Sequence, residues 1–206
     1  MIRIAVILTV YNRRDITLSG LASLYKAIAY LEKTDIQKEY VFDIFMTDDG
    51  CTDGTGDAVK KQFPHVIIIR GNGSLYWCGG MRKAWECAVG SGVSYDYFLW
   101  FNDDVVLFED ALVTLLSVRQ DEKMDYSIVS GAFCDNNGKV SYGGKTKEDI
   151  LIEPNGSFQN IALMNGNIVL IPLSVYKLLG MIDKHFIHSW GDYDYGLRAQ
   201  QKLVGV

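Results

Sequence analysis

The run of residues 2–10 constrains the fold of this chain more than any other feature of its sequence. The run is apolar and rich in β-branched side chains, which is typical of a strand buried on both faces of a sheet. Apolar side chains at helical spacing follow it, and strand and helix patterns then alternate up to residue 104. Because such strands need helices on both sides, we predict an α/β fold: a three-layer α/β/α sandwich with a mostly parallel central sheet.

The same patterns predict the remaining elements. In the first half, strands are expected at residues 41–46, 66–69 and 97–101, and helices at residues 21–31, 53–63, 80–89 and 112–116. After residue 125 the regular alternation of strand and helix patterns ends. Strands are then expected at residues 127–133, 140–145 and 161–171, a turn at 135–138, a loop at 145–160, and helices at 172–179 and 190–203.

Polar side chains follow three of the first four predicted strands. They are Tyr11, Asn12 and Arg13, then Asp48, Asp49 and Asp53, and finally Asn102, Asp103 and Asp104. Because the carboxyl ends of parallel strands meet at one edge of a sheet, five carboxylates are expected along one rim. Like charges at such proximity are unfavourable unless a cation or hydrogen-bond donors compensate them.

The acids that follow the second predicted strand and those that follow the fourth need separate explanations. Asp103 and Asp104 lie between two apolar stretches, and their hard oxygen atoms suit Mg²⁺ or Mn²⁺, which also bind substrate phosphates. Asp53 is expected to cap the following helix, but two consecutive carboxylates, Asp48 and Asp49, exceed what a cap requires. One of this second pair could accept a hydrogen bond from the N–H of a nucleobase.

The acidic charge limits the classes of partner. A net charge of −5 argues against a duplex nucleic-acid binder, which needs a basic stripe, and implies that a phosphate-bearing partner is held through a metal. The four cysteines show no spacing typical of a zinc site or a disulfide framework, and no segment reaches the length of a membrane span. We therefore expect a cytoplasmic protein with reduced thiols, with a peripheral contact to the inner face of a membrane as the alternative.

Four motifs occur along the chain in a fixed order. They are Thr-Val-Tyr-Asn-Arg at residues 9–13, Thr-Asp-Asp-Gly-Cys-Thr-Asp-Gly-Thr at 47–55, Asn-Asp-Asp at 102–104 and Gly-Asp-Tyr-Asp-Tyr-Gly-Leu-Arg at 191–198. Together they resemble the family-2 glycosyltransferases, with their GT-A nucleotide-sugar-binding fold and an Asp-x-Asp-type metal motif. The glycine-rich stretch 72–82 is similar to that of rhamnosyltransferase-like members.

The resemblance implies roles for single residues on the donor side. Thr9, Tyr11 and Asp49 would line the nucleobase pocket, with Asp49 accepting the pyrimidine N–H. Asp104 would coordinate a metal ion that bridges the two phosphates of the donor, and Asp103 would face the ribose or the donor sugar. Further substrate-binding candidates are Asn12, Arg13, Asp48, Gly73, Gly80, Arg82 and Trp190.

The resemblance also implies a general base on the acceptor side. This chain has Gly191-Asp192 where the family often has Glu-Asp, so the base role falls on Asp192, with Asp194 as its competitor. The base would take the proton of the acceptor hydroxyl during direct displacement at the anomeric carbon, through a transition state resembling an oxocarbenium ion. No Gln-x-x-Arg-Trp motif follows, so a processive polysaccharide synthase is not expected.

These implications predict an inverting, metal-dependent glycosyltransferase. It would move a sugar from a UDP- or dTDP-linked donor to a saccharide or lipid-linked acceptor in cell-surface polysaccharide synthesis. The alternative is a non-catalytic nucleotide-sugar-binding module. A dinucleotide-dependent oxidoreductase is disfavoured because no G-x-G-x-x-G follows the first strand. We expect one domain over residues 1–206, truncated at its C-terminus, with a nucleotide-sugar-binding half at 1–104 and an acceptor-side half at 105–206.

Overall fold

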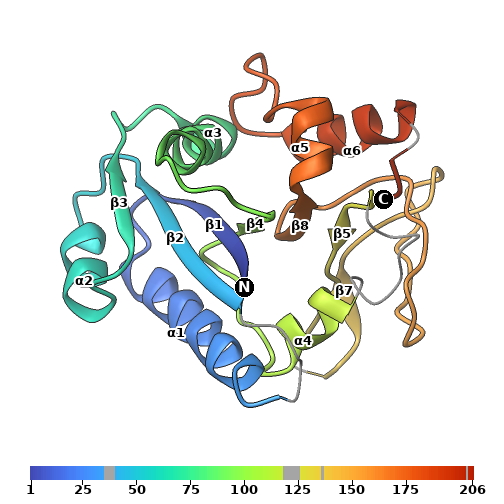
Figure 1. The fold of residues 1–206 in the computed structure, drawn as a ribbon, viewed down its shortest axis with the longest axis horizontal. Helices are drawn as coiled ribbons and strands as arrows, with labels where there is room; N and C mark the ends of the chain where they lie inside the picture. The colour runs from blue at the N-terminus through green and yellow to red at the C-terminus, as the bar shows by residue number, and fades with distance from the viewer. Residues whose placement is uncertain (35–39, 118–125, 136, 203) are drawn as a thin grey trace.

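The computed structural model describes residues 1–34, 40–117, 126–135, 137–202 and 204–206. Its main sheet has the strand order β3-β2-β1-β4-β8-β5 (Figure 1). The strands are β1 Ile2–Val10, β2 Tyr40–Asp48, β3 Ile67–Arg70, β4 Tyr97–Phe101, β5 Val129–Ser130 and β8 Ile168–Pro172. The pairs β1–β2, β1–β4 and β2–β3 are parallel, whereas β8 runs antiparallel to β4 and β5. The predicted mostly parallel sheet is confirmed.

Helices cover both faces of this sheet (Figure 1). Their bounds are α1 Arg14–Leu31, α2 Thr55–Gln62, α3 Tyr76–Gly90, α4 Ala111–Leu116, α5 Leu173–Leu179 and α6 Gly191–Gln201. The side chains of α1, α2 and α4 share one hydrophobic core with the sheet, and those of α3, α5 and α6 share the other. The three-layer α/β/α arrangement is therefore confirmed. None of the helices in the described ranges combines the length and apolarity needed to cross a bilayer.

Strand β1 explains why its sequence is apolar almost throughout. Successive side chains of a strand point to opposite faces of the sheet. Ile4, Val6 and Leu8 belong to the core on the α1 side, whereas Ala5 and Ile7 belong to the core on the α3 side. All five are fully buried, so both faces of the strand select for apolar residues.

Two predicted strands in the second half are wrong in extent. Residues 127–133 do not form one strand, because β5 pairs with β8 while the chain beyond it enters a separate two-stranded sheet of β6 Phe133–Cys134 and β7 Val140–Tyr142. Of the predicted strand at 161–171, only the residues of β8 form a strand of the main sheet. The reason is a turn just before β8, in which the side chain of Asn165 accepts the backbone N–H of Asn167 at 2.9 Å.

The remaining elements occur where they are predicted, but α1 begins at Arg14 instead of residue 21, α3 begins at Tyr76 instead of residue 80, and the strand predicted at 140–145 is only β7, which ends at Tyr142. Helix α6 ends at Gln201, and residue 203, the predicted end, lies outside the described residues, as does residue 136 of the predicted turn. Strand β8 comes from the second half of the chain but pairs with β4 of the first half. One sheet thus contains strands from both sides of residue 104.

Candidate active site

The loop after β1 joins the loops after β2 and β4 at one rim of the sheet. Asn12, whose φ is 51°, accepts the backbone N–H of Thr52 at 2.7 Å through its side-chain oxygen. The guanidinium of Arg13, the next residue, donates to Asp103 and Asp104, which follow β4. Strand order reverses at β1, because β2 lies on one side of it and β4 on the other. Ligands of open α/β sheets bind in the crevice at such a point.

A single guanidinium nitrogen bridges the two acids that follow β4. Nη1 of Arg13 lies 3.0 Å from Oδ1 of Asp103 and 3.1 Å from Oδ2 of Asp104. Asp103 is buried, and its second oxygen accepts the hydroxyl of Thr17 at 2.9 Å. Burial raises the pKa of Asp103, although the hydrogen bond from Thr17 and the charge of Arg13 oppose that rise. The two consecutive acids therefore have different environments.

Asp104 is the acid of this pair that a bound ligand can reach. Its side chain is 43% exposed, and its ion pair with Arg13 uses Oδ2. A divalent cation in nucleotide-binding sites takes one or two carboxylates and completes its coordination with water and substrate phosphates. No three acidic, histidine or cysteine side chains form a complete metal site within the described residues. The donor set at Asp104 thus fits a cation shared with a diphosphate, and does not fit a cation held by protein ligands alone.

The two acids that end β2 support the loops around the site. Asp48 is completely buried, pairs with Arg70 and accepts the backbone N–H of Cys51 at 2.8 Å. Asp49 is also buried, and its two oxygens accept three backbone N–H groups from residues 73–76 at 2.9 to 3.2 Å. This carboxylate occupies the N-terminal end of α3, where the helix dipole favours a negative charge. A direct contact between Asp49 and a nucleobase stays a prediction.

Three further predicted residues lie on the same rim. Gly80 of α3 packs directly against Thr9, because a Cβ atom at Gly80 would come within 2.0 Å of the Thr9 hydroxyl. Gly73 has a φ of 84°, a left-handed conformation that turns the loop over Gly50. Tyr11 is 55% exposed and is therefore accessible to a ligand.

The N-terminal end of α6 presents two acids with different partners. Asp192 accepts the backbone N–H groups of Gly166 and Tyr193, each at 2.9 Å, and its pKa is raised by burial, which those two hydrogen bonds oppose. Asp194 pairs with Nε of Arg198 at 2.8 Å, one helical turn later. Since the carboxylate of Asp194 is engaged by Arg198 whereas Asp192 has a raised pKa and no cationic partner among these contacts, Asp192 is the better candidate for the proton acceptor.

Arg82 supports the segment that leads into α6. Its Nη1 donates to the backbone carbonyls of Asp183 and Phe186, each at 2.9 Å. The backbone N–H of Cys78 donates to Ile187 nearby, so α3 holds this segment at several points. The structure thus gives the Arg82 guanidinium two protein partners, whereas the sequence predicted a substrate contact for it.

A chain of polar side chains that was not predicted from the sequence connects the two sides of the site. Asn102 accepts the indole N–H of Trp77 at 2.7 Å and donates to the side chain of Asn167 at 2.6 Å. The neighbouring Gly166 is the residue whose backbone N–H holds Asp192. The Asn-Gly-Asn sequence at 165–167, inside an otherwise apolar stretch, is the signal that could have indicated this role.

Tyr142 of β7 is a further titratable residue that the sequence did not indicate. Burial raises the pKa of its phenol, the charges of Asp192 and Tyr193 raise it further, and the charge of Lys145 opposes this rise. The residue is 47% exposed and is therefore accessible to solvent.

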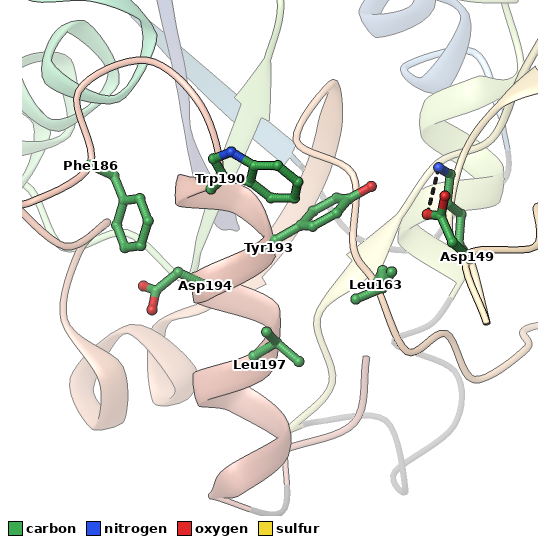
Figure 2. A pocket seen from close by; sticks show the side chains of 8 residues that line it. Asp149, Leu163, Phe186, Trp190, Tyr193, Asp194 and Leu197 are labelled. Atoms are coloured by element: carbon green, nitrogen blue, oxygen red, sulfur yellow. Dashed lines mark hydrogen bonds and ion pairs between the residues drawn. The ribbon is translucent and has the colours of Figure 1, made fainter. Parts of the chain in front are cut away.

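A pocket of about 660 Å³ lies beside α6 (Figure 2). It is lined by Lys145, Asp149, Leu163, Phe186, Trp190, Tyr193, Asp194 and Leu197. Figure 2 shows the Tyr193 ring extending from α6 to the side where Leu163 and Asp149 lie, whereas Asp194 lies on the side of Phe186. Trp190 is 65% exposed, has a φ of 71° and places its ring centroid 5.3 Å from that of Tyr193. An exposed indole and a half-buried phenol ring thus line the pocket at the start of α6, where Asp192 also lies, although Asp192 itself does not line the pocket.

The α/β/α fold gathers acids at the carboxyl ends of its parallel strands, where ligands of open α/β sheets bind. The model of the family described as glycosyl transferase family 2 matches residues 5–176, and the chain belongs to this family. No curated protein sequence matches the chain.

Several solved structures share this fold, which is the GT-A fold predicted from the sequence. The mannosyltransferase PcManGT from Pyrobaculum calidifontis, in complex with GDP-Man and Mn²⁺, is 13% identical with a TM-score of 0.61. S. aureus TarS 1–349 is 14% identical with a TM-score of 0.65, and its complex with UDP-GlcNAc is 13% identical with a TM-score of 0.60. Each comparison covers 97% of this chain but only 51%, 55% and 53% of the other chain, respectively. The chain therefore spans about half the length of these structures.

Proposed function

We propose that this chain carries the catalytic site of an inverting, metal-dependent glycosyltransferase. The donor is a UDP- or dTDP-linked sugar, and the acceptor is a saccharide or a lipid-linked saccharide in cell-surface polysaccharide synthesis. Membership of the family supports sugar transfer, and structures with the same fold were solved with GDP-Man, UDP and UDP-GlcNAc. The observation that carries the proposal is Asp192, a half-buried carboxylate with a raised pKa at the start of α6, where Trp190 and Tyr193 line a pocket.

On the donor side, the rim around β1 binds the nucleotide. Tyr11 offers an exposed ring to the base, while Asp49 keeps the 73–76 loop in place. Asp104, with Mg²⁺ or Mn²⁺, faces the diphosphate, and PcManGT was solved with Mn²⁺. When bound, the cation would neutralise charge on the departing nucleoside diphosphate. Asp103 accepts hydrogen bonds from Arg13 and Thr17 and so helps to hold this region in place.

On the acceptor side, Asp192 acts as the general base. The acceptor hydroxyl oxygen forms a bond to the anomeric carbon as the bond from that carbon to the diphosphate oxygen breaks, and the hydroxyl proton passes to a carboxylate oxygen of Asp192. The backbone N–H groups of Gly166 and Tyr193 fix the orientation of this carboxylate. Attack from the face opposite the leaving group inverts the anomeric configuration.

The acceptor lies against the aromatic side of α6. Trp190 and Tyr193 present apolar faces suited to the C–H face of a sugar ring, and Lys145 and Asp149 add polar groups to the pocket. We place the enzyme in the cytoplasm, where nucleotide sugars are made available, with a peripheral membrane contact in the case of a lipid-linked acceptor.

The test separates catalysis from binding alone. The chain is incubated with Mn²⁺, a panel of nucleoside-diphosphate sugars and a mixture of saccharide acceptors, and product is identified by mass spectrometry and its anomeric configuration by NMR. Product with inverted configuration is expected, and Asp104→Asn should lose about 10- to 100-fold in metal-dependent activity. Donor binding without any product would instead indicate a nucleotide-sugar-binding module, and metal dependence that survives Asp104→Asn would remove the metal assignment.

A further inference from the structure

Arg13 holds the position from which a cation would neutralise the acids after β4. One nitrogen, Nη1, contacts both Asp103 and Asp104 at 3.0 and 3.1 Å. Partial burial lowers the pKa of Arg13, but the charges of these two acids together raise it above its ordinary value. The side chain of Arg13 is nevertheless 45% exposed, so the guanidinium lies at the edge of the site and has room to move away from it.

The two contacts of Arg13 differ in strength. Asp103 is only 6% exposed as a side chain and is fixed by Thr17, so a charge there is poorly solvated and depends on Arg13 for compensation. Asp104 is 43% exposed and is partly solvated by water. An exposed ion pair contributes little free energy, so the contact with Asp104 is the weaker of the two and the easier to exchange.

We propose that Arg13 is the resident counter-cation of the Asp103–Asp104 pair, and that a divalent cation must displace Arg13 from Asp104 in order to bind there. The proposal rests on the function proposed above, because it concerns the metal at Asp104. Two positive groups cannot share Oδ2 of Asp104 without strong mutual repulsion. Arg13 therefore weakens the binding of a metal alone, and the anionic phosphates of the donor favour the exchange by offering the guanidinium another partner.

A purely structural role for Arg13 has a different signature. If Arg13 only ties the loop after β1 to the loop after β4, its loss lowers stability and a metal ion cannot restore it. If Arg13 serves as a counter-cation, a divalent cation can take over its role, because the net charge near Asp103 and Asp104 is then compensated again. Metal-dependent rescue of stability thus separates the two roles without any measurement of turnover.

The test compares Arg13→Gln with a matched control, Arg14→Gln. Arg14 is the next residue, and its side chain pairs with Asp15 rather than with the acids after β4. Both variants lose one positive charge, at adjacent positions between the loop after β1 and the start of α1. Mn²⁺ binding is followed by electron paramagnetic resonance with and without UDP, and the melting temperature is measured in EDTA and in Mn²⁺.

We expect Arg13→Gln to bind Mn²⁺ alone about 5- to 10-fold more tightly than wild type, whereas Arg14→Gln stays close to wild type. In EDTA, Arg13→Gln should melt about 2–4 °C lower than wild type, and Mn²⁺ should restore most of this loss. Adding Asp104→Asn to Arg13→Gln should abolish the gain in Mn²⁺ affinity, since the two changes act on one interaction.

Equal Mn²⁺ affinity in the Arg13→Gln and Arg14→Gln variants, or a melting temperature that Mn²⁺ does not restore, would overturn the proposal while leaving the proposed function intact. If wild type binds UDP but never Mn²⁺, even with UDP present, the metal dependence of the proposed function fails, and the exchange fails with it. Should Arg13→Gln not fold, Arg13→Lys replaces it. A lysine keeps the charge but not the fixed geometry of the guanidinium, so a smaller gain in Mn²⁺ affinity over wild type is expected, and no gain would overturn the proposal.

Discussion

At the scale of single residues, the site is defined by which acids have a cation beside them. Asp48 is paired with Arg70, Asp103 and Asp104 share Arg13, and Asp194 is paired with Arg198. Asp192 accepts hydrogen bonds from backbone N–H groups, which stabilise its charge less than a cation does, and burial raises its pKa. It is therefore the acid best suited to accept a proton.

Replacing each acid of α6 in turn tests this difference. Asp192→Asn should lower kcat by about 10²- to 10⁴-fold, because the variant cannot accept the hydroxyl proton, while donor binding stays close to wild type. Asp194→Asn should instead retain turnover but lose stability, because Arg198 is left without its partner. Steady-state kinetics and calorimetric titration of UDP provide the readouts. A dead Asp194→Asn with an active Asp192→Asn would reverse the assignment, and turnover in both would mean that neither acid is the base.

The raised pKa of Asp192 also predicts how stability depends on pH. An ordinary aspartate titrates near pH 3.9 in the unfolded chain, and folding raises this pKa, so the folded state binds the proton more tightly. The contribution of Asp192 to stability is thus fully present below about pH 3.9 and is lost as the pH rises through the folded pKa. The melting temperature of wild type relative to Asp192→Asn should therefore fall as the pH rises from about 4 to about 7. Asparagine can accept only one of the two backbone N–H groups, a loss that does not depend on pH, so the change of the difference with pH is the readout. A difference that stays constant over this pH range would contradict the raised pKa.

At the scale of elements, helix α3 forms hydrogen bonds with loops from distant parts of the sequence. Asp49 fixes the start of α3 from β2, and Arg82 fixes the approach to α6 from the middle of α3. The donor-side loop and the acceptor-side motif are thereby attached to one helix. A substitution that removes either set of hydrogen bonds should therefore disturb the site.

Asp49→Ala should disorder the 73–76 loop, because three backbone N–H groups lose their acceptor. These N–H groups are part-buried and water can reach some of them, so the loss for each is less than the roughly 1–3 kcal/mol of a fully buried unsatisfied group, and a fall of about 1–3 kcal/mol in total is expected in the free energy of unfolding. Nucleotide binding should weaken even without metal, since the loop lies beside the predicted base pocket. Urea unfolding and UDP titration in EDTA measure the two effects. Unchanged stability would show that the loop does not depend on Asp49.

Two glycines of α3 provide a matched pair of substitutions. Gly80→Ala places a Cβ atom within 2.0 Å of the Thr9 hydroxyl, so α3 must move away from β1, whereas a Cβ atom at Gly90 meets nothing within 4 Å. We expect Gly80→Ala to destabilise the protein by about 1–3 kcal/mol and Gly90→Ala to leave it unchanged or slightly more stable. Thermal unfolding of both variants decides this, and equal melting temperatures would contradict the close approach.

At the scale of the whole molecule, the two cores share the central strands. Leu99 of β4 belongs to the core on the α1 side, whereas Phe98 and Trp100 belong to the core on the α3 side. Strand β8 pairs with β4 although more than sixty residues of chain separate them. Neither core can lose its packing without disturbing the other.

The shared strands predict one cooperative unfolding transition for the 206-residue chain. Trp85 and Trp100 lie in the core on the α3 side, so tryptophan fluorescence reports on that layer, whereas far-UV circular dichroism reports on all helices. The two signals should change at the same urea concentration. Two separate transitions would indicate that the layers unfold independently.

The sequence by itself determined the α/β class, the order of the elements up to residue 104 and the places where polar motifs end the strands. These features depend on local periodicity, since a strand buried on both faces must be apolar at nearly every position, as β1 is. The extent of the strands after residue 125 was predicted poorly, because a short edge strand and a turn closed by Asn165 leave no regular period in the sequence.

Only the tertiary structure decided which partner each polar side chain has. Arg13 meets Asp103 across ninety residues of sequence, and Asp192 meets Gly166 across twenty-six. The packing of helices on the sheet sets such contacts, and a local pattern contains no information about them. The sequence could therefore favour Asp192 as the base and keep Asp194 as its competitor, but only the fold placed a guanidinium beside Asp194 and backbone amides beside Asp192, because charge compensation depends on distance in space rather than along the chain.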